Sequence, residues 1–289
     1  DRVTTFRMFT RALPILRRTA VGAGAVGAAI VASAAAGPVR VQAAPLTSEA
    51  PAAARVAAAS PASAQDPSRG LQAQYGDRLV VLESPALRAL FSKIRDKETP
   101  GTTWFWYADR LMSILAEEGL ASTPGSEPAV IETPCGYYDG RKMDDPQKLA
   151  IVSIVRGGDS LLEAVRSKTP GSATGKILIQ RDESDAEKRP KLFYSKLPPD
   201  IRDRYVILVD PMLATGGSAS KAIDVLREAG VRQSDIMFLN VVACPEGLHR
   251  LFADHPKVKV VTAAVDLKLN SNKYIVPGLG DYGDRYFNT

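Results

Sequence analysis

The segment formed by residues 205–226 restricts the fold of this chain more than any other part of the sequence. Its apolar run, residues 205–209, predicts a buried strand that Asp210 ends, and a loop with two adjacent glycines follows. Ser218 then begins a predicted helix whose apolar residues recur at helical spacing. Because the loop N–H groups and the positive end of the helix dipole converge at one point, this unit predicts an anion-binding site. An ordinary strand-to-helix turn is the alternative.

The spacing of the glycines excludes two common phosphate-binding loops. No lysine follows them as in the GxxxxGK[ST] loop, and the spacing is not that of the GxGxxG pattern either. The carboxylate of Asp210 at the strand end suits the hydroxyls of a ribose, or a metal-bound sugar phosphate, better than a bare anion. The residues therefore favour a phosphorylated sugar as the ligand of this loop.

Apolar runs that alternate with helical patterns predict the rest of the domain. We expect strands at 79–82, 148–155, 175–181, 235–242 and 257–265, and helices at 87–93, 104–120, 160–165 and 245–253. This alternation is typical of βαβ crossovers and a parallel sheet. Arg156, Arg181 and Asp210 each end a strand, and open α/β sheets bind ligands beyond the carboxyl ends of their strands. We therefore expect these three residues at one edge of the sheet.

The C-terminal residues 275–284 have a different composition. They carry three glycines and a proline, which excludes a regular helix or a central strand. Rigid irregular backbone with apolar side chains suits the recognition of a flat base by main-chain groups. A C-terminal segment that only wraps over the core is the alternative.

The net charge of +5 belongs to the N-terminal part of the chain. Residues 1–70 contain eight arginines, no lysine and three acidic residues, and the remainder is formally neutral. The basic composition is therefore no argument for a globular part that binds nucleic acid.

Residues 1–70 also predict a targeting leader followed by a flexible linker rich in proline, alanine and serine. No acidic residue lies between Met8 and Glu49, and the segment is rich in Arg, Ala, Ser and Thr, which is typical of an organelle transit peptide, plastid before mitochondrion. Arg17 and Arg18 precede an apolar run, and this pattern is also interpreted as a second signal, for further export. An uncleaved membrane anchor and a disordered tail are the alternatives. Residues 71–289 form the expected globular domain, without stable membrane insertion.

Two segments of this domain resemble the uracil phosphoribosyltransferase family. Residues 210–218, DPMLATGGS, are similar to that family's loop for phosphoribosyl pyrophosphate (PRPP), and residues 274–284, YIVPGLGDYGD, resemble its uracil-reading segment. Both occur in the family's order, and the resemblance runs from about residue 79 to 289. It implies a type I phosphoribosyltransferase-like α/β fold: a mostly parallel sheet flanked by helices, with a small C-terminal hood and a hairpin arm at about 130–140.

The resemblance implies that uracil and PRPP react to give UMP and pyrophosphate. Asp210 is the implied catalytic residue, because its charge would favour an oxocarbenium-like transition state. Mg²⁺ is the implied cofactor, bridging pyrophosphate oxygens. The implied PRPP-binding residues are Arg156, Arg181, Asp210, Pro211, Met212, Leu213, Ala214, Thr215, Gly216, Gly217, Ser218 and Asp281. The implied uracil-binding residues are Ile275, Gly280, Asp281 and Tyr282, mainly through main-chain groups.

Further features follow from the same resemblance. Residues 182–189 would form a mobile flap that closes over PRPP, with a solvated surface loop as the alternative. Arg95 and Asp96 resemble the family's early arginine-aspartate motif, for which a solvated charged turn is the alternative. The family forms dimers and higher assemblies, and some members respond to GTP, so we expect a homo-oligomer and consider GTP as an effector. A catalytically inactive relative, serving as a regulatory or structural subunit of a larger assembly, is the alternative function.

Overall fold

The computed structural model of this chain describes residues 66–181 and 190–289. The leader up to residue 65 and the expected flap at 182–189 lie outside the described residues. Among those that are described, no helix is long and apolar enough to cross a membrane.

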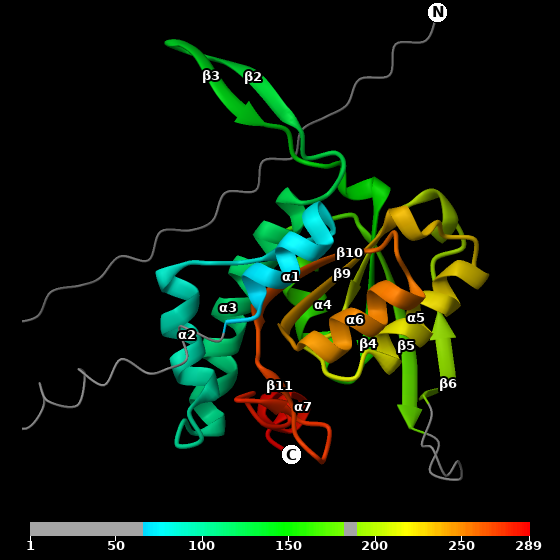
Figure 1. Ribbon diagram of the computed structural model, residues 1–289. Helices are drawn as coiled ribbons and strands as arrows, with labels where there is room; N and C mark the ends of the chain where they lie inside the picture. The colour runs from blue at the N-terminus through cyan, green and yellow to red at the C-terminus, as the bar shows by residue number, and fades with distance from the viewer. Residues whose placement is uncertain (1–65, 182–189) are drawn as a thin grey trace, which may run out of the picture. The chain divides into compact units, whose positions relative to one another are not determined.

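A mostly parallel sheet forms the centre of the domain (Figure 1). Its strands lie in the order β1 (Leu79–Val81), β10 (Lys259–Val265), β9 (Ile236–Ala243), β7 (Tyr205–Val209), β4 (Leu149–Val155), β5 (Ala173–Arg181) and β6 (Pro190–Lys196). Neighbouring strands pair in parallel, except that β6 is antiparallel to β5. This arrangement confirms the predicted α/β class, and the central strands are the predicted ones with ends shifted by one or two residues.

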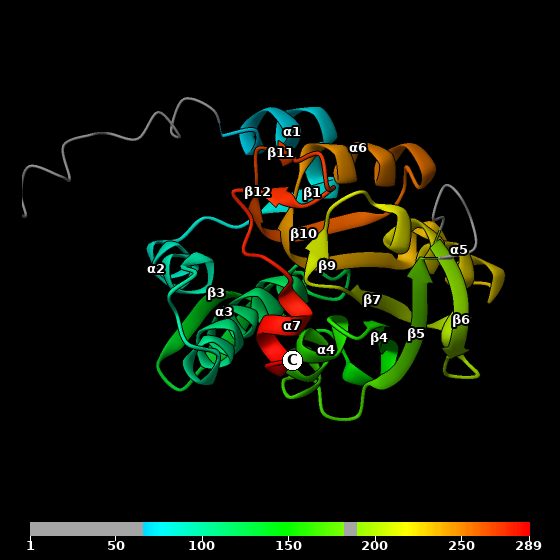
Figure 2. The ribbon, with the colours of Figure 1, turned by 90° about the horizontal axis from the view of Figure 1, so that it is seen from below.

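Helices cover both faces of this sheet (Figure 2). One core cluster joins the sheet to α2 (Pro85–Arg95), α3 (Gly101–Ala121), α4 (Gly158–Arg166) and α7 (Tyr282–Phe287). The other joins it to α1 (Ser68–Tyr75), α5 (Gly217–Glu228) and α6 (Pro245–Asp254). Strand β7 shows why both layers are needed: Val206 and Leu208 pack on the second cluster, whereas Ile207 and Val209 pack on the first. Burial on both faces explains the continuous apolar runs in the sequence.

The predicted hairpin arm is present. Strands β2 (Pro128–Thr133) and β3 (Gly136–Arg141) pair with each other in antiparallel register and form a sheet of their own. They extend away from the helices beside them (Figure 1). Their apolar side chains, which include Val130, Ile131 and Tyr137, are exposed.

The prediction that residues 275–284 contain no regular helix was wrong for the last three residues of this segment. The short helix α7 begins at Tyr282, and the Asp281 side chain caps it by accepting a hydrogen bond from the Asp284 N–H at 3.0 Å. The glycines at 278 and 280 precede the helix, so they do not interrupt it. Before them, β12 (Ile275–Val276) pairs with β11 (Lys268–Leu269) in a small antiparallel sheet.

Two further details differ from the expectation. Helix α5 begins at Gly217, one residue before the predicted start, because Gly216 occupies the N-cap position with φ 74°. The loop before it contains the two-residue strand β8 (Met212–Leu213), which pairs with Val242 and Ala243 of β9. A pairing this short has no periodic signal in the sequence, since it depends on a partner strand far along the chain.

Candidate active site

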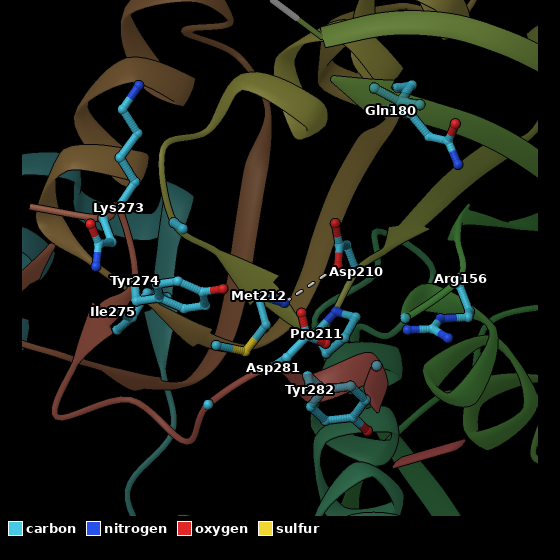
Figure 3. Close-up of a pocket in the computed structure, with 16 residues that line it drawn as sticks. Arg156, Gln180, Asp210, Pro211, Met212, Lys273, Tyr274, Ile275, Asp281 and Tyr282 are labelled. Atoms are coloured by element: carbon cyan, nitrogen blue, oxygen red, sulfur yellow. Dashed lines mark hydrogen bonds between the residues drawn. The ribbon is translucent and has the colours of Figure 1, made fainter. Parts of the chain in front are cut away.

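A cavity of about 680 Å³ lies at the carboxyl ends of β4, β5 and β7 (Figure 3). The ends of these strands form one wall, and the C-terminal residues that follow β11 form the other. The residues that line it are Arg156, Gly157, Ile179, Gln180, Asp210, Pro211, Met212, Ala214, Asn272, Lys273, Tyr274, Ile275, Gly280, Asp281, Tyr282 and Gly283.

The cavity brings together residues that were predicted from two distant motifs. Arg156, Asp210, Pro211, Met212 and Ala214 line it from the sheet and the loop after β7. The tail contributes all four residues expected to bind uracil, which are Ile275, Gly280, Asp281 and Tyr282. A ligand that touches both motifs therefore fits in one continuous space.

Among the other predicted residues whose side chains are described, Leu213, Thr215, Gly216, Gly217 and Ser218 do not line the cavity. Leu213 is buried in the core below the loop. Thr215, Gly216, Gly217 and Ser218 form the turn into α5 and its first residues. Strand β5 ends at Arg181, whose side chain lies outside the described part of the structure. The roles of these residues in binding PRPP stay predictions.

Asp210 follows the last residue of β7 and is half-buried in the cavity. Its N–H donates to the Leu239 carbonyl at 3.3 Å, and its carboxylate accepts from the Met212 N–H at 3.4 Å. Burial raises the pKa of Asp210 to about 7, against the opposing effect of the Met212 hydrogen bond. A ligand that donates hydrogen bonds to this carboxylate would stabilise its ionised form.

The loop after Asp210 is held from behind by the start of α6. The Leu213 carbonyl accepts from the Cys244 N–H at 3.2 Å, and the Ala214 carbonyl accepts from the Cys244 thiol at 3.0 Å. A Cβ atom on Gly216 would lie 2.9 Å from the Gly247 carbonyl oxygen. The loop carbonyls therefore have partners behind it, while the first N–H groups of a helix such as α5 have no partner within the helix. This geometry suits an anion.

Arg156, the predicted pyrophosphate ligand, is engaged by the C-terminal helix. Its guanidinium pairs with the Asp284 carboxylate at 2.5 Å and donates to the Thr289 hydroxyl at 3.2 Å. The Phe287 ring centroid is 5.7 Å from the guanidinium carbon. About half of the side chain is exposed, at 49%. Arg156 therefore lies at the edge of the cavity with one ion-pair partner and access to solvent.

Tyr282 lines the cavity without presenting its hydroxyl to it. The hydroxyl donates to the Met112 sulfur at 3.0 Å and lies 3.2 Å from the Ser160 hydroxyl. Burial raises the pKa of Tyr282. Figure 3 shows the hydroxyl pointing away from Asp210. Any contact of Tyr282 with a base is therefore expected from its main chain, as the sequence motif implied.

Gln180, Asn272, Lys273 and Tyr274 line the cavity but were not among the predicted site residues. Gln180 could have been found by the rule that strand ends carry the site, since it precedes Arg181 at the end of β5. Tyr274 begins the segment that resembles the uracil-reading motif, whereas Asn272 and Lys273 just before it gave no signal. Lys273 has a positive φ of 64°, a conformation that side-chain pattern alone does not reveal.

Comparisons with known proteins agree with this arrangement. The family model described as uracil phosphoribosyltransferase matches residues 81–289. The uracil phosphoribosyltransferase of Dictyostelium discoideum is 48% identical over 218 residues, which cover 74% of this chain and 98% of that protein. The Arabidopsis thaliana protein named uridine/cytidine kinase UKL1, chloroplastic, is 39% identical over 215 residues, 74% of this chain and 44% of that protein.

A solved structure of similar fold is that of the AQ2163 protein from Aquifex aeolicus. It superposes with a TM-score of 0.61 at 28% sequence identity and covers 72% of this chain and 97% of its own. The family match and the fold similarity both cover the domain that contains the cavity. This chain belongs to the uracil phosphoribosyltransferase family.

Proposed function

We propose that this protein transfers the phosphoribosyl group of PRPP to uracil, which gives UMP and pyrophosphate. The observation that carries the proposal is the single cavity lined both by the loop after β7 and by the C-terminal tail. A sugar diphosphate held by the loop and a base held by the tail would meet there. Uracil N1 would form the bond to ribose C1′ and lose its proton, while the bond from C1′ to pyrophosphate breaks.

Each part of the sugar diphosphate has a candidate partner. The N–H groups of residues 214–218, at the start of α5, would hold the 5′-phosphate, with the helix dipole favouring its charge. Asp210 would accept from the ribose hydroxyls and place its charge near C1′, where positive charge develops. Arg156 and Arg181 would bind the pyrophosphate, since a guanidinium matches two phosphate oxygens. Water has to be excluded, because it would hydrolyse PRPP.

The tail would select the base through its main chain. Uracil presents two carbonyl oxygens and the N3–H group. Ile275 and Gly280 line the cavity, and their main-chain groups would meet these atoms. Cytosine carries an amino group in place of one carbonyl and has no N3–H. Each mismatched buried hydrogen-bonding group costs roughly 1–3 kcal/mol. The proposed site therefore prefers uracil to cytosine.

Mg²⁺ would supply charge neutralisation on the diphosphate when bound. The carboxylates of Asp210 and Asp281 belong to residues that line the cavity, and carboxylate oxygens are ligands that Mg²⁺ accepts. No group of three or more His, Cys, Asp or Glu that could hold a metal is present among the described residues. This donor set fits a cation that keeps several waters and is carried mainly by the substrate's oxygens.

Location and assembly belong to the same proposal. We propose that residues 1–70 direct the chain to an organelle, first to the plastid; their composition and the chloroplast name of an Arabidopsis relative support this. N-terminal sequencing of the native protein tests the targeting role, since a retained Met8 contradicts cleavage.

The exposed apolar side chains of the β2–β3 hairpin support a homo-oligomer. A GTP effector stays a prediction from the family.

The function is tested by turnover of the full-length protein with PRPP and Mg²⁺, in reactions that contain uracil, cytosine or no base. The expected result is uracil-dependent release of pyrophosphate together with UMP, and little of either with cytosine. Equal rates with and without uracil would contradict the transfer reaction. If the protein binds PRPP but does not turn over uracil, the alternative function as a catalytically inactive subunit would be favoured.

A further inference from the structure

An ion pair outside the cavity joins three distant parts of the chain. Arg95 is the last residue of α2, and Asp266 follows the last residue of β10. The guanidinium of Arg95 donates to both carboxylate oxygens of Asp266, each at 2.7 Å. The Asp266 side chain is 5% exposed and that of Arg95 22%. Neither residue lines the cavity, so their role is not direct contact with a ligand there.

The pair holds both polar main-chain groups of Gly278 in the C-terminal tail. The Gly278 N–H donates to the Asp266 carboxylate at 2.8 Å, and its carbonyl accepts from the Arg95 guanidinium at 2.8 Å. Gly278 has φ 63°, and a Cβ atom there would lie 2.1 Å from the Ile275 carbonyl oxygen. The tail is therefore sharply turned at this residue, and the turn is fixed between two charged side chains. Gly280, two residues further on, lines the cavity.

A second guanidinium fixes the next carbonyl of the tail to the same helix end. Arg285 donates to the Leu279 carbonyl at 2.8 Å and to the Ile94 carbonyl at 2.7 Å. It also donates to the Asp96 carbonyl at 2.8 Å. The backbone at 278 and 279 is thus tied to the end of α2 just before it reaches Gly280. Arg95 is therefore not part of a fully solvated turn, since it bonds Asp266 and the Gly278 carbonyl, whereas Asp96 is exposed.

Stability alone does not explain a buried charge pair at this point. Replacing a buried ion pair by apolar residues is often neutral for stability, so such a pair is weak evidence for a stabilising role. A bidentate arginine–carboxylate pair does provide directional bonds, and here it satisfies a donor and an acceptor of one glycine. We propose that Arg95 and Asp266 are positioning residues of the base site, which hold the tail so that the main chain at Ile275 and Gly280 faces uracil. This inference rests on the proposed function.

The kinetic test compares Arg95→Lys and Asp266→Asn with the unchanged full-length protein. Lysine keeps the charge but cannot form two parallel bonds to a carboxylate while also reaching a carbonyl. Losing one hydrogen bond between the tail and uracil weakens binding about tenfold or more, so we expect KM for uracil to rise by at least that factor. We expect a smaller rise in KM for PRPP, because its proposed ligands lie mostly in the loop after β7 and in β4 and β5, outside the network, and only Asp281 lies in the tail. Discrimination against cytosine falls.

Arg204→Lys is the matched control. Arg204 is 19% exposed, pairs with Asp200 at 2.7 Å and donates to the Gln147 carbonyl, so it resembles Arg95 in its own burial and in bonding one carboxylate and one carbonyl, although Asp200 is 50% exposed. It precedes β7, at the opposite end of the strand from Asp210, and does not line the cavity. We expect this variant to keep both KM values. An equal rise in KM for uracil in the control would mean that any lost arginine pair has this effect, and would overturn the proposal.

Amide hydrogen exchange gives a readout that does not depend on activity. We expect faster exchange across residues 275–281 in both network variants, and unchanged exchange there in Arg204→Lys. If the exchange pattern is as expected but neither the parent nor the variants turn over uracil, the positioning role stands and the proposed reaction is refuted. Unchanged exchange in the tail together with unchanged KM for uracil would overturn the positioning role and leave the reaction standing.

Discussion

Asp210 is the residue whose protonation matters most for the proposed chemistry. Burial raises its pKa to about 7, so near neutral pH the free protein contains both the acid and the carboxylate. The carboxylate accepts hydrogen bonds from the ribose hydroxyls more strongly than the acid does, and only the carboxylate brings a negative charge to stabilise positive charge at C1′. Binding of PRPP is therefore expected to favour ionisation of Asp210, because the ligand's hydroxyls bond to the charged form.

This predicts a pH dependence of kcat/KM for PRPP, which reports the free enzyme. The acid form gains population as the pH falls through about 7, so kcat/KM should decrease below that pH and level off above it. Asp210→Asn removes both the charge and the titration. We expect its kcat to fall about 100-fold or more, the cost of losing one transition-state stabilising group. Its residual rate should lack the decrease below pH 7; near-normal kcat would refute the role of Asp210.

At the scale of single residues, the sequence revealed those that end a strand or belong to a long motif. Asp210 and Arg156 were predicted in this way, and both line the cavity. Lys273 was missed because it sits in an irregular turn, where no periodicity indicates which side chains face inward. Tyr274 begins the C-terminal motif but was not singled out as a site residue. Arg95 was ambiguous for a different reason. Its partner Asp266 lies 171 positions away, and no local pattern connects the two.

At the scale of elements, the loop between β7 and α5 depends on a glycine that other residues cannot replace. Gly216 has φ 74° and caps α5. A Cβ atom there would lie 2.9 Å from the Gly247 carbonyl oxygen, which belongs to α6 and cannot rotate away. The backbone of the proposed phosphate site and the packing of α5 on α6 are therefore fixed at the same residue.

Gly216→Ala should therefore lower the free energy of unfolding by about 1–3 kcal/mol, since strain of this kind costs that much for residues other than glycine. Gly70→Ala in α1 is the control, because a Cβ atom there meets nothing within 4 Å. It should be neutral or stabilise by about 0.4–1 kcal/mol. Urea denaturation of both variants, compared at a common m value, measures the difference. Equal stability of Gly216→Ala and the parent would show that the loop tolerates a side chain.

The long elements could be predicted and the short ones could not. Strands β4, β7 and β9 are apolar on both faces, so their signal is strong without any knowledge of their neighbours. β8 exists only because Met212 and Leu213 pair with a strand some thirty residues further along the chain. Helix α7 depends on the Asp281 cap and on burial of the Tyr282 ring. Tertiary contacts of this kind override local propensity.

At the scale of the whole domain, the site joins two parts of the chain with different structural support. The loop after β7 rests on the sheet and on α6, whereas the tail is tied to the end of α2 by Arg95 and Arg285. Sugar phosphate and base would thus be held by separate supports that meet at one cavity. This division explains why a change in the tail's anchor is expected to affect uracil more than PRPP.

The most direct measurement of this account is a crystal structure of the protein with UMP bound. The account predicts the phosphate of UMP against the N–H groups of residues 214–218 and its ribose hydroxyls on the Asp210 carboxylate. The uracil ring should lie on the main chain of Ile275 and Gly280. UMP bound in a different place, or in this cavity with its base on the loop and its phosphate on the tail, would contradict the central claim.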